Sequence, residues 1–498
     1  NSPEKIILPE GVEEIGASAF EGCKSLVDVS MPESVRRIGD RAFEDTKLLK
    51  DFTGGFLILG DCLIRYEDDT ATEMEVPYGV RVIGDNAVQG LNLEGIILPE
   101  GVKILGMRSF SGCGKLKTIS FPASIESVGE YCFEYCQFES VYIQDLSAWC
   151  RIDFAATASS PFSYSTKLFV GDCPAIRLRV PSSVERIGKF AFRGLGTIIS
   201  LEMEAGAKEI GEGAFYNCRG LKSVTIAPSV EHVGDDAFNF CTGLSTLVLN
   251  NGLISIGDRA FYECDDLSSV DIPSTVKTIG EAAFFWCDGL TSVHIPSGVE
   301  SIADSAFAGC GLKVASIPSS VTNIGCRAFD GADINVEEGN PVYRSEHGIL
   351  YDMIRNELQS CPMSMSGVVL VPEGVSSIGR SAFQDCESIT SVVLPEGVTN
   401  IGDYAFNWCR GLKSVEIPLS VKNIGLNAFG YCQVENATIS STFKMTDVFD
   451  TYNYYYLKKV VIPSGTTEIV EDAFSGCSGL SAITIPSSIN SCGPFAFY

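Results

Sequence analysis

Three residues in the middle of the chain are of the types that hydrolytic enzymes use: Asp271, Ser292 and His294. Asp271 and His294 are 23 residues apart, which is also the spacing of a motif that recurs along the chain. If segments of this length stack in register, these two side chains lie on neighbouring strands. Ser292 and His294 would share one strand face about 7 Å apart, too far for the hydrogen bond between a nucleophile and its base. We therefore predict an exposed ion pair between Asp271 and His294 and no catalytic triad.

Other catalytic motifs are missing from the sequence. It has no GxGxxG segment opening a helix, no P-loop and no H-E-x-x-H. His232 and His347 stand outside any motif, and the carboxylates are too scattered to form a glycosidase pair. The acidic residues come mostly one per repeat, as expected for a solvated face and not for a calcium site. We predict a protein that is not an enzyme and has no cofactor and no metal site.

The 19 cysteines follow a pattern. Twelve of them fall three residues after a repeated phenylalanine: Cys23, Cys113, Cys136, Cys218, Cys241, Cys264, Cys287, Cys310, Cys386, Cys409, Cys432 and Cys477. Equivalent positions stack in a repeat protein, so we expect a ladder of free, buried thiols whose S–H groups serve backbone carbonyls. Stacked side chains do not converge as a disulfide requires, and a row of sulfurs is no tetrahedral zinc site. Cys150 and Cys173 lie in one insertion and could pair.

The repeat itself reads Ile-Gly-x-x-Ala-Phe, as in Ile15–Phe20 and Ile401–Phe406. Sixteen copies keep the phenylalanine, and Val88 marks a seventeenth, degenerate copy. The phenylalanines are Phe20, Phe43, Phe110, Phe133, Phe192, Phe215, Phe238, Phe261, Phe284, Phe307, Phe329, Phe383, Phe406, Phe429, Phe474 and Phe497. Between Phe192 and Phe329 they recur every 22 or 23 residues. A fixed period in this range predicts a solenoid.

One regular copy, residues 267–287, suggests how a coil is built. Val270 and Ile272 alternate on one face of a short strand, and Pro273 ends that strand because it has no N–H to donate. Gly280 is expected to permit a tight bend. Several copies carry Asp after this glycine, which we interpret as the N-cap of a short helical turn. These aspartates are Asp40, Asp85, Asp235, Asp258 and Asp403.

Stacked coils can bury the apolar groups that a single coil cannot. We therefore predict an α/β solenoid, a curved rod of about 17 coils of 22–23 residues. A parallel β-sheet would line the concave face, short helical turns the convex face and free cysteines the core. The whole chain, 1–498, would be a single solenoid with insertions at about 48–72, 144–176, 333–366 and 440–458.

The charge balance bears on possible partners. Asp and Glu number 63 against 36 Lys and Arg, a formal net charge of −27. Such a surface repels phosphate backbones and anionic lipid, so we expect no nucleic-acid partner and no peripheral membrane binding. No apolar run approaches the roughly 20 residues of a membrane span. Neither end has a polar cap and no signal peptide precedes the first coil, so we expect a trimmed or mature fragment.

Candidate binding residues lie on the outward strand positions and in the fourth insertion. The outward positions are mostly small and polar, and Glu202, Thr225, Asp271, His294 and Glu416 are the ones we select. The fourth insertion contains a tyrosine cluster with Tyr452, Tyr454 and Tyr455. Tyr and Asn are favoured on recognition surfaces; alternatively, these rings only cover the side of a coil.

The unit Ile-Pro-x-x-Val-x-x-Ile-Gly-x-x-Ala-Phe-x-x-Cys-x-x-Leu-x-x-Val resembles the BspA-like class of leucine-rich repeats. The stretches Val141–Val170 and Asn340–Pro362 resemble insertions of that family, and residues 55–66 resemble a weaker copy of the latter. Departures from the pattern are Val88 for Phe, and Ala303 and Val470 for Gly.

The resemblance implies an extracellular or cell-surface, adhesin-like scaffold that binds a protein or glycan, and it supplies no catalytic residues. We expect a monomer. Two alternatives remain open: a repeat region that carries or targets a catalytic domain absent from this sequence, and a structural spacer.

Overall fold

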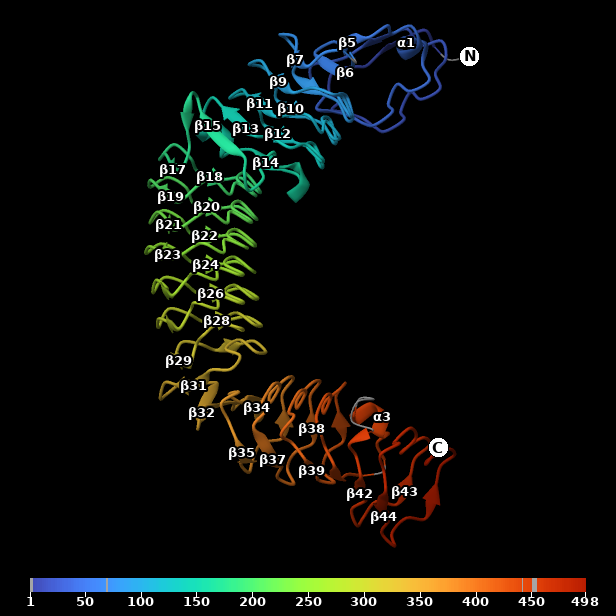
Figure 1. Ribbon diagram of the computed structural model, residues 1–498, viewed down its shortest axis with the longest axis vertical. Coiled ribbons are helices and arrows are strands. Elements are labelled where there is room, and N and C mark those ends of the chain that lie inside the picture. The colour runs from blue at the N-terminus through green and yellow to red at the C-terminus, as the bar shows by residue number, and fades with distance from the viewer. Residues whose placement is uncertain (1–2, 69, 441, 450–454) are drawn as a thin grey trace. The chain divides into compact units, whose positions relative to one another are not determined.

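The computed structural model describes residues 3–68, 70–440, 442–449 and 455–498. Their contacts group into two units, residues 1–268 and 269–498. In both, one coil follows another along the stack, as the colour gradient of Figure 1 shows. The prediction of one solenoid with four insertions over the whole chain stays a prediction.

Each regular coil contributes one strand of three to five residues to a first row of parallel strands, which are divided among several sheets. The surface that these strands form is here called the sheet face. In residues 1–268 the strands are β1 (Lys5–Ile7), β3 (Asp28–Ser30), β7 (Glu73–Glu75), β9 (Gly95–Ile97), β11 (Thr118–Phe121), β13 (Ser140–Ile143), β15 (Lys167–Val170), β17 (Arg177–Val180), β19 (Ser200–Met203), β21 (Ser223–Thr225) and β23 (Thr246–Val248). In residues 269–498 they are β25 (Ser269–Asp271), β27 (Ser292–His294), β29 (Val314–Ile317), β31 (Asp333–Val336), β35 (Gly367–Leu370), β37 (Ile389–Val393), β39 (Ser414–Glu416), β41 (Asn436–Thr438), β42 (Lys459–Val461) and β44 (Ala482–Thr484).

A second parallel ladder, which the sequence analysis missed, runs through the two residues before each motif glycine. Its strands in residues 1–268 are β2 (Glu14–Ile15), β4 (Arg37–Ile38), β8 (Val82–Ile83), β10 (Ile104–Leu105), β12 (Ser127–Val128), β14 (Asp153–Phe154), β18 (Arg186–Ile187), β20 (Glu209–Ile210), β22 (His232–Val233) and β24 (Ser255–Ile256). In residues 269–498 they are β26 (Thr278–Ile279), β28 (Ser301–Ile302), β30 (Asn323–Ile324), β36 (Ser377–Ile378), β38 (Asn400–Ile401), β40 (Asn423–Ile424), β43 (Glu468–Ile469) and β45 (Ser491–Cys492).

The predicted helical turns are wrong. The Ala-Phe segments are hydrogen-bonded turns, and the residue before each Ala-Phe has a positive φ, between 48° and 59°. In a regular turn three N–H groups donate to the next coil, as Phe190, Phe192 and Gly194 do to the carbonyls of Glu212, Ala214 and Tyr216 at 2.7–2.9 Å. We call this third set of bonds the turn ladder, and the surface that it forms the turn face.

The motif aspartates have a different role from the one predicted. Asp40, Asp85, Asp235, Asp258 and Asp403 cap no helix, because the described turns contain none. Instead, Asp85 Oδ1 accepts the N–H of Met107, and Asp403 Oδ1 accepts that of Leu426, at 2.8 and 2.7 Å. Asp235 accepts the N–H of Asp258 in the same way, so these three carboxylates tie their coils to the next one.

The reason given for the motif glycines is also wrong. None of them, Gly280 included, has a positive φ. A Cβ on Gly129 would lie 2.6 Å from the backbone nitrogen of Met107 in the preceding coil, whereas a Cβ on Gly16 would meet nothing within 4 Å. Glycine is needed because adjacent backbones approach closely at this point.

The core consists of stacked side chains. The rings of Phe215 and Phe238 are stacked with centroids 5.2 Å apart, and those of Phe383 and Phe406 are 4.8 Å apart. Beside them, thiols donate to the carbonyl of the phenylalanine one coil earlier, as Cys218 does to Phe192 at 3.1 Å. This confirms the predicted cysteine ladder, although Cys23, Cys136, Cys310 and Cys477 are only half-buried. Cys150 and Cys173 are both free thiols.

The predicted insertions replace parts of coils with other elements. The first contains α1 (Lys47–Lys50) and the hairpin β5 (Gly55–Leu59) and β6 (Cys62–Glu67). The second contains α2 (Leu146–Trp149), η1 (Thr157–Ser159) and β16 (Cys173–Pro174), and the fourth contains α3 (Met445–Val448). The third contains the antiparallel strands β32 (Tyr343–Glu346), β33 (Ile349–Asp352) and β34 (Glu357–Ser360).

Candidate functional site

The outward residues of β17 to β23 include two that the sequence analysis selected. Glu202 on β19 is exposed and in register with the half-buried Thr225 on β21. On β17, Arg179 is in register with Glu202 and forms an ion pair with Glu204 at 3.2 Å. This part of the sheet face therefore carries charges of both signs.

Asp271 and His294 are in register on β25 and β27, and both are exposed. The predicted ion pair between them is wrong: within the described part of the chain, neither side chain has an ion pair or hydrogen bond. Proximity in register alone does not make them a site.

Glu416 lies in a groove of the sheet face, which we call the sheet groove. This hollow of about 700 Å³ lies over β37, β39, β41 and β42, and its lining includes Val393, Leu419, Asn436 and Lys459. Beside it, Leu370 is 69% exposed and in register with Val393, which is 49% exposed. Exposed apolar groups beside Glu416 and Lys459 are suited to binding another molecule. β35 is an apolar run, Gly-Val-Val-Leu, without alternating polar residues, so its sequence does not show which side chains point outward.

The tyrosine cluster of the fourth insertion is only partly described. Tyr452 and Tyr454 lie outside the described residues. Tyr455 is 75% exposed, and its neighbour Leu457 is fully buried. An exposed ring at this point is available for contact.

Two further hollows lie on the turn face, each next to a hairpin insertion. Here the turn ladder is interrupted: the N–H of Tyr66, from the hairpin, donates to the carbonyl of Ala87, which would otherwise accept from the coil before the insertion. In the same way, Cys361 from the third insertion donates to the carbonyl of Ala382. The insertion thus takes over one rung of the ladder, and a hollow remains beside it.

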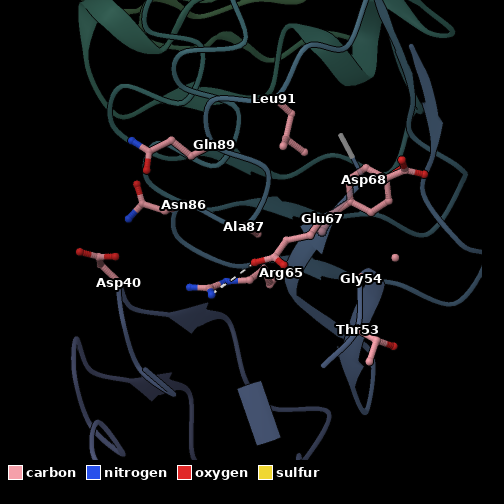
Figure 2. Close-up of a pocket in the computed structure, with 12 residues that line it drawn as sticks. Asp40, Thr53, Gly54, Arg65, Glu67, Asp68, Asn86, Ala87, Gln89 and Leu91 are labelled. Carbon is pink, nitrogen blue, oxygen red and sulfur yellow. Dashed lines mark ion pairs between the residues drawn. The ribbon is translucent and has the colours of Figure 1, made fainter. Parts of the chain in front are cut away.

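The first hollow, of about 810 Å³, is strongly acidic (Figure 2). Asp40, Glu67 and Asp68 contribute carboxylates, and Arg65 is its one guanidinium among the lining residues. That guanidinium is occupied, because it forms ion pairs with Glu44 at 2.8 Å and with Glu67 at 3.5 Å, the latter drawn as a dashed line in Figure 2. Any ligand here would meet net negative charge.

The second hollow, of about 530 Å³, has a different lining. Two guanidiniums, Arg327 and Arg380, face two carboxylates, Glu281 and Asp304. Amides, hydroxyls and aromatic rings complete the wall: Ser305, Ser381, Gln384, Tyr404, Asn407, Trp408, Asn427 and Tyr431. Cys326 also lines it, and burial raises the pKa of this thiol, so that it is an unreactive group at neutral pH.

The thiols of the core are likewise held in the neutral form. Burial raises the pKa of Cys218 to about 12 and that of Cys477 to about 11. The thiolate is the nucleophile and the metal ligand, so these sulfurs are suited to packing and not to catalysis. In the part of the chain that the structure describes, no cluster of three His, Cys, Asp or Glu residues could hold a metal ion.

A family model for the BspA type leucine-rich repeat region matches residues 2–54, 66–154, 163–290, 208–335 and 376–498, with six copies. The chain belongs to this BspA type family. The match leaves out residues 55–65, 155–162 and 336–375, which lie in or next to the first three insertions, and it runs through the fourth. BspA type repeats therefore account for most of the three ladders and for the stacked phenylalanines.

Solved structures of similar proteins come from several bacteria. A leucine-rich cell surface protein of Faecalibacterium prausnitzii is 28% identical, with a TM-score of 0.49 over 62% of this chain and 87% of that one. A leucine-rich repeat protein of Eubacterium ventriosum is 22% identical, with a TM-score of 0.45 over 65% and 90%. The pneumococcal vaccine antigen PcpA is 19% identical, with a TM-score of 0.44 over 64% and 83%. None of the curated proteins matches this BspA type chain.

A search for membrane-spanning helices in this BspA type protein found none of sufficient length and apolarity within the described residues.

Proposed function

We propose that this protein is a non-enzymatic binding scaffold, extracellular or attached to a cell surface, that recognises a protein ligand through the sheet groove. The family supports the scaffold role, because its repeats supply a rigid surface and no catalytic residues. The cellular location is proposed from the same resemblance. The groove is the single observation that carries the choice of ligand.

The chemistry of the groove favours a protein over a sugar. Val393 and Leu419, in the lining of the groove, and Leu370 beside it expose apolar side chains, and two opposite charges, Glu416 and Lys459, also lie among the lining residues. A polypeptide can bury apolar side chains on the first group while its own charges meet the second. Apolar contacts at the centre with charges around them are typical of protein interfaces.

A glycan and protein array probed with the whole chain would identify ligands. A matched pair of variants would then show whether a ligand binds in the sheet groove. Val393→Asp puts a charge into the groove, and Val248→Asp puts one at the equivalent outward position of β23, which is also exposed. We expect Val393→Asp to weaken binding at least about tenfold, or about 1.4 kcal/mol, and Val248→Asp to leave it unchanged.

Equal binding by both variants would contradict a role for the groove. Deleting residues 440–458 and combining Glu202→Ala, Asp271→Ala and Glu416→Ala would then test the other candidate surfaces. A chain that binds nothing on the array would instead favour the role of a spacer, or of a carrier for a catalytic domain absent from this sequence.

A further inference from the structure

The second hollow differs from the first in its free positive charge. Arg380 is exposed, and among the described residues its guanidinium forms no ion pair and no hydrogen bond. Arg327 spans the interruption, because it forms ion pairs with Asp330 on its own coil and with Asp385 at 3.2 Å on the coil after the insertion.

The position of Arg380 in the repeat adds to this. It follows the motif glycine Gly379, where Asp85, Asp235 and Asp403 in other coils accept an N–H from the next coil. The guanidinium of Arg380 cannot accept a hydrogen bond, so this coil lacks the side-chain bond to the next coil and has a cation at the hollow instead. The backbone nearby lacks the usual bond between coils. The carbonyl of Arg380 accepts a hydrogen bond from the thiol of Cys326, and the N–H of Arg327 has no acceptor within the described residues.

Trp408 and Tyr431, which we call the aromatic wall of the hollow, occupy backbone positions where φ is positive and glycine is favoured. Trp408 and Tyr431 have φ angles of 63° and 54°, whereas seven other coils place Gly at this position: Gly22, Gly90, Gly112, Gly194, Gly309, Gly331 and Gly476. The rings of Trp408 and Tyr431 stack with centroids 4.6 Å apart, and the guanidinium of Arg410 lies over Trp408. Tyr135, Phe240 and Trp286 hold the same position in other coils, but of these five aromatic residues only Trp408 and Tyr431 line the hollow.

We propose that the second hollow binds an oligosaccharide that carries a carboxylate. Arg380 is placed to pair with the carboxylate, since guanidinium and carboxylate match as a two-bond pair. The amides of Gln384, Asn407 and Asn427 can each donate to and accept from sugar hydroxyls. The C–H faces of sugar rings can pack on the aromatic wall. This site lies on the turn face and is separate from the sheet groove, so it does not depend on the function proposed there.

Two pairs of probes test the carboxylate. Sialyllactose is compared with lactose, and trigalacturonate with its methyl ester, by isothermal titration calorimetry on the whole chain. We expect each acid to bind at least about tenfold more tightly than its neutral partner. Arg380→Gln should abolish this preference, and Arg355→Gln, which removes an arginine outside the hollow, should preserve it.

A second pair of variants tests the wall. Trp408→Gly removes the indole at a position where glycine is the residue of seven other coils, so the coil should still fold. We expect it to weaken binding of acidic and neutral probes alike. Tyr135→Gly makes the equivalent change in residues 1–268 and should weaken neither. Circular dichroism checks that each variant is folded.

The proposal is overturned if neither acid binds at about 1 mM, if the acids bind no better than their neutral partners, or if Arg380→Gln retains the preference. Val393→Asp, which alters only the sheet groove, should leave sugar binding unchanged. Failure of the groove and failure of the hollow are therefore distinguishable.

Discussion

At the scale of single residues, each motif position meets a requirement set by the neighbouring coil. The phenylalanine stacks on its counterpart, and the cysteine donates a hydrogen bond to a backbone carbonyl of the preceding coil. The glycine, having no Cβ, lets the backbone of the preceding coil approach closely. The residue before Ala-Phe must adopt a left-handed conformation, which costs about 1–2 kcal/mol for a residue with a side chain. The chain accepts this cost in sixteen of its coils, because that conformation directs the N–H groups into the turn ladder.

The close approach at the motif glycine gives a prediction with an internal control. Gly129→Ala would place a methyl group 2.6 Å from the nitrogen of Met107, so we expect a loss of about 1–3 kcal/mol in the free energy of unfolding. Gly16→Ala meets open space and should change this free energy by less than about 1 kcal/mol. Urea unfolding followed by circular dichroism measures both. Equal losses would show that the backbone conformation, and not contact between coils, requires glycine. Ala303 shows that one coil can adjust.

The buried thiols predict how stability depends on pH. The pKa of Cys218 rises from 9.0 to about 12 on burial. Between these values the unfolded chain loses a proton that the folded chain keeps, so this thiol's contribution is intact below about pH 9 and is lost as the pH rises toward 12. The expected slope is about 1.4 kcal/mol per pH unit for one thiol.

Cys218→Ala removes this one titration. The parent should be more stable than the variant at pH 7, and their difference in free energy of unfolding should shrink as the pH rises from about 9 to 10.5. Urea unfolding at a series of pH values measures it. A difference that stays constant over this range would mean that the thiol is not kept neutral by burial.

At the scale of elements, each coil is joined to the next by three ladders and by side chains that repeat with the same period. Lys208 pairs with Glu231, and Lys277 with Glu300, both at 2.8 Å and both across 23 residues. These pairs are exposed, so each adds little to stability. Because they repeat with the period of the coils, these pairs favour one register between neighbouring coils. Nearly identical strands alone would not determine that register.

The aspartate after the motif glycine should matter more than these pairs. Asp403→Ala removes the acceptor for the N–H of Leu426 and should lower the free energy of unfolding by about 1–2 kcal/mol. Asp403→Asn keeps an oxygen at the same place and should recover most of the loss. Thermal unfolding of the three proteins tests this. An asparagine variant as unstable as the alanine variant would mean that the charge, and not the hydrogen bond, is what the coil needs.

The sequence predicts the elements that repeat and misses those that depend on local contacts. The period alone predicts the stacked phenylalanines, the thiol ladder and the parallel sheet. It does not predict the strands at Thr278–Ile279 and equivalent positions, because two residues carry too little pattern. The turns were mistaken for helix because an aspartate before Ala-Phe suits both a helix cap and a bond to the next coil.

The candidate sites were predicted less well than the fold. The sequence points to Glu416 but not to the exposed Leu370 and Val393 beside it. Both lie in apolar runs without alternating polar residues, so the pattern does not show which side chains point outward. Arg380 could have been noticed, since most coils carry an acidic residue at this position, after the motif glycine. The hollow itself could not, because it forms where an insertion interrupts the turn ladder.

At the scale of the whole molecule, stability comes from the sum of contacts between neighbouring coils. In such an array the ends of the chain make no direct contact, and cooperativity fails over long distances. The contacts of this chain group into residues 1–268 and 269–498. We therefore expect unfolding in more than one step, whether or not the coils form one continuous solenoid.

The three tryptophans allow this to be measured. Trp149 is buried in residues 1–268, where its Nε1–H donates to the carbonyl of Ala191 at 2.9 Å, and Trp286 and Trp408 belong to residues 269–498. A chain with Trp286→Phe and Trp408→Phe reports on the first group alone, and one with Trp149→Phe on the second. Adding Gly129→Ala should shift the urea midpoint of Trp149 fluorescence and leave that of the other two in place. If both midpoints moved together, the coils would unfold as one cooperative body, and stability could not be assigned to one part of the chain.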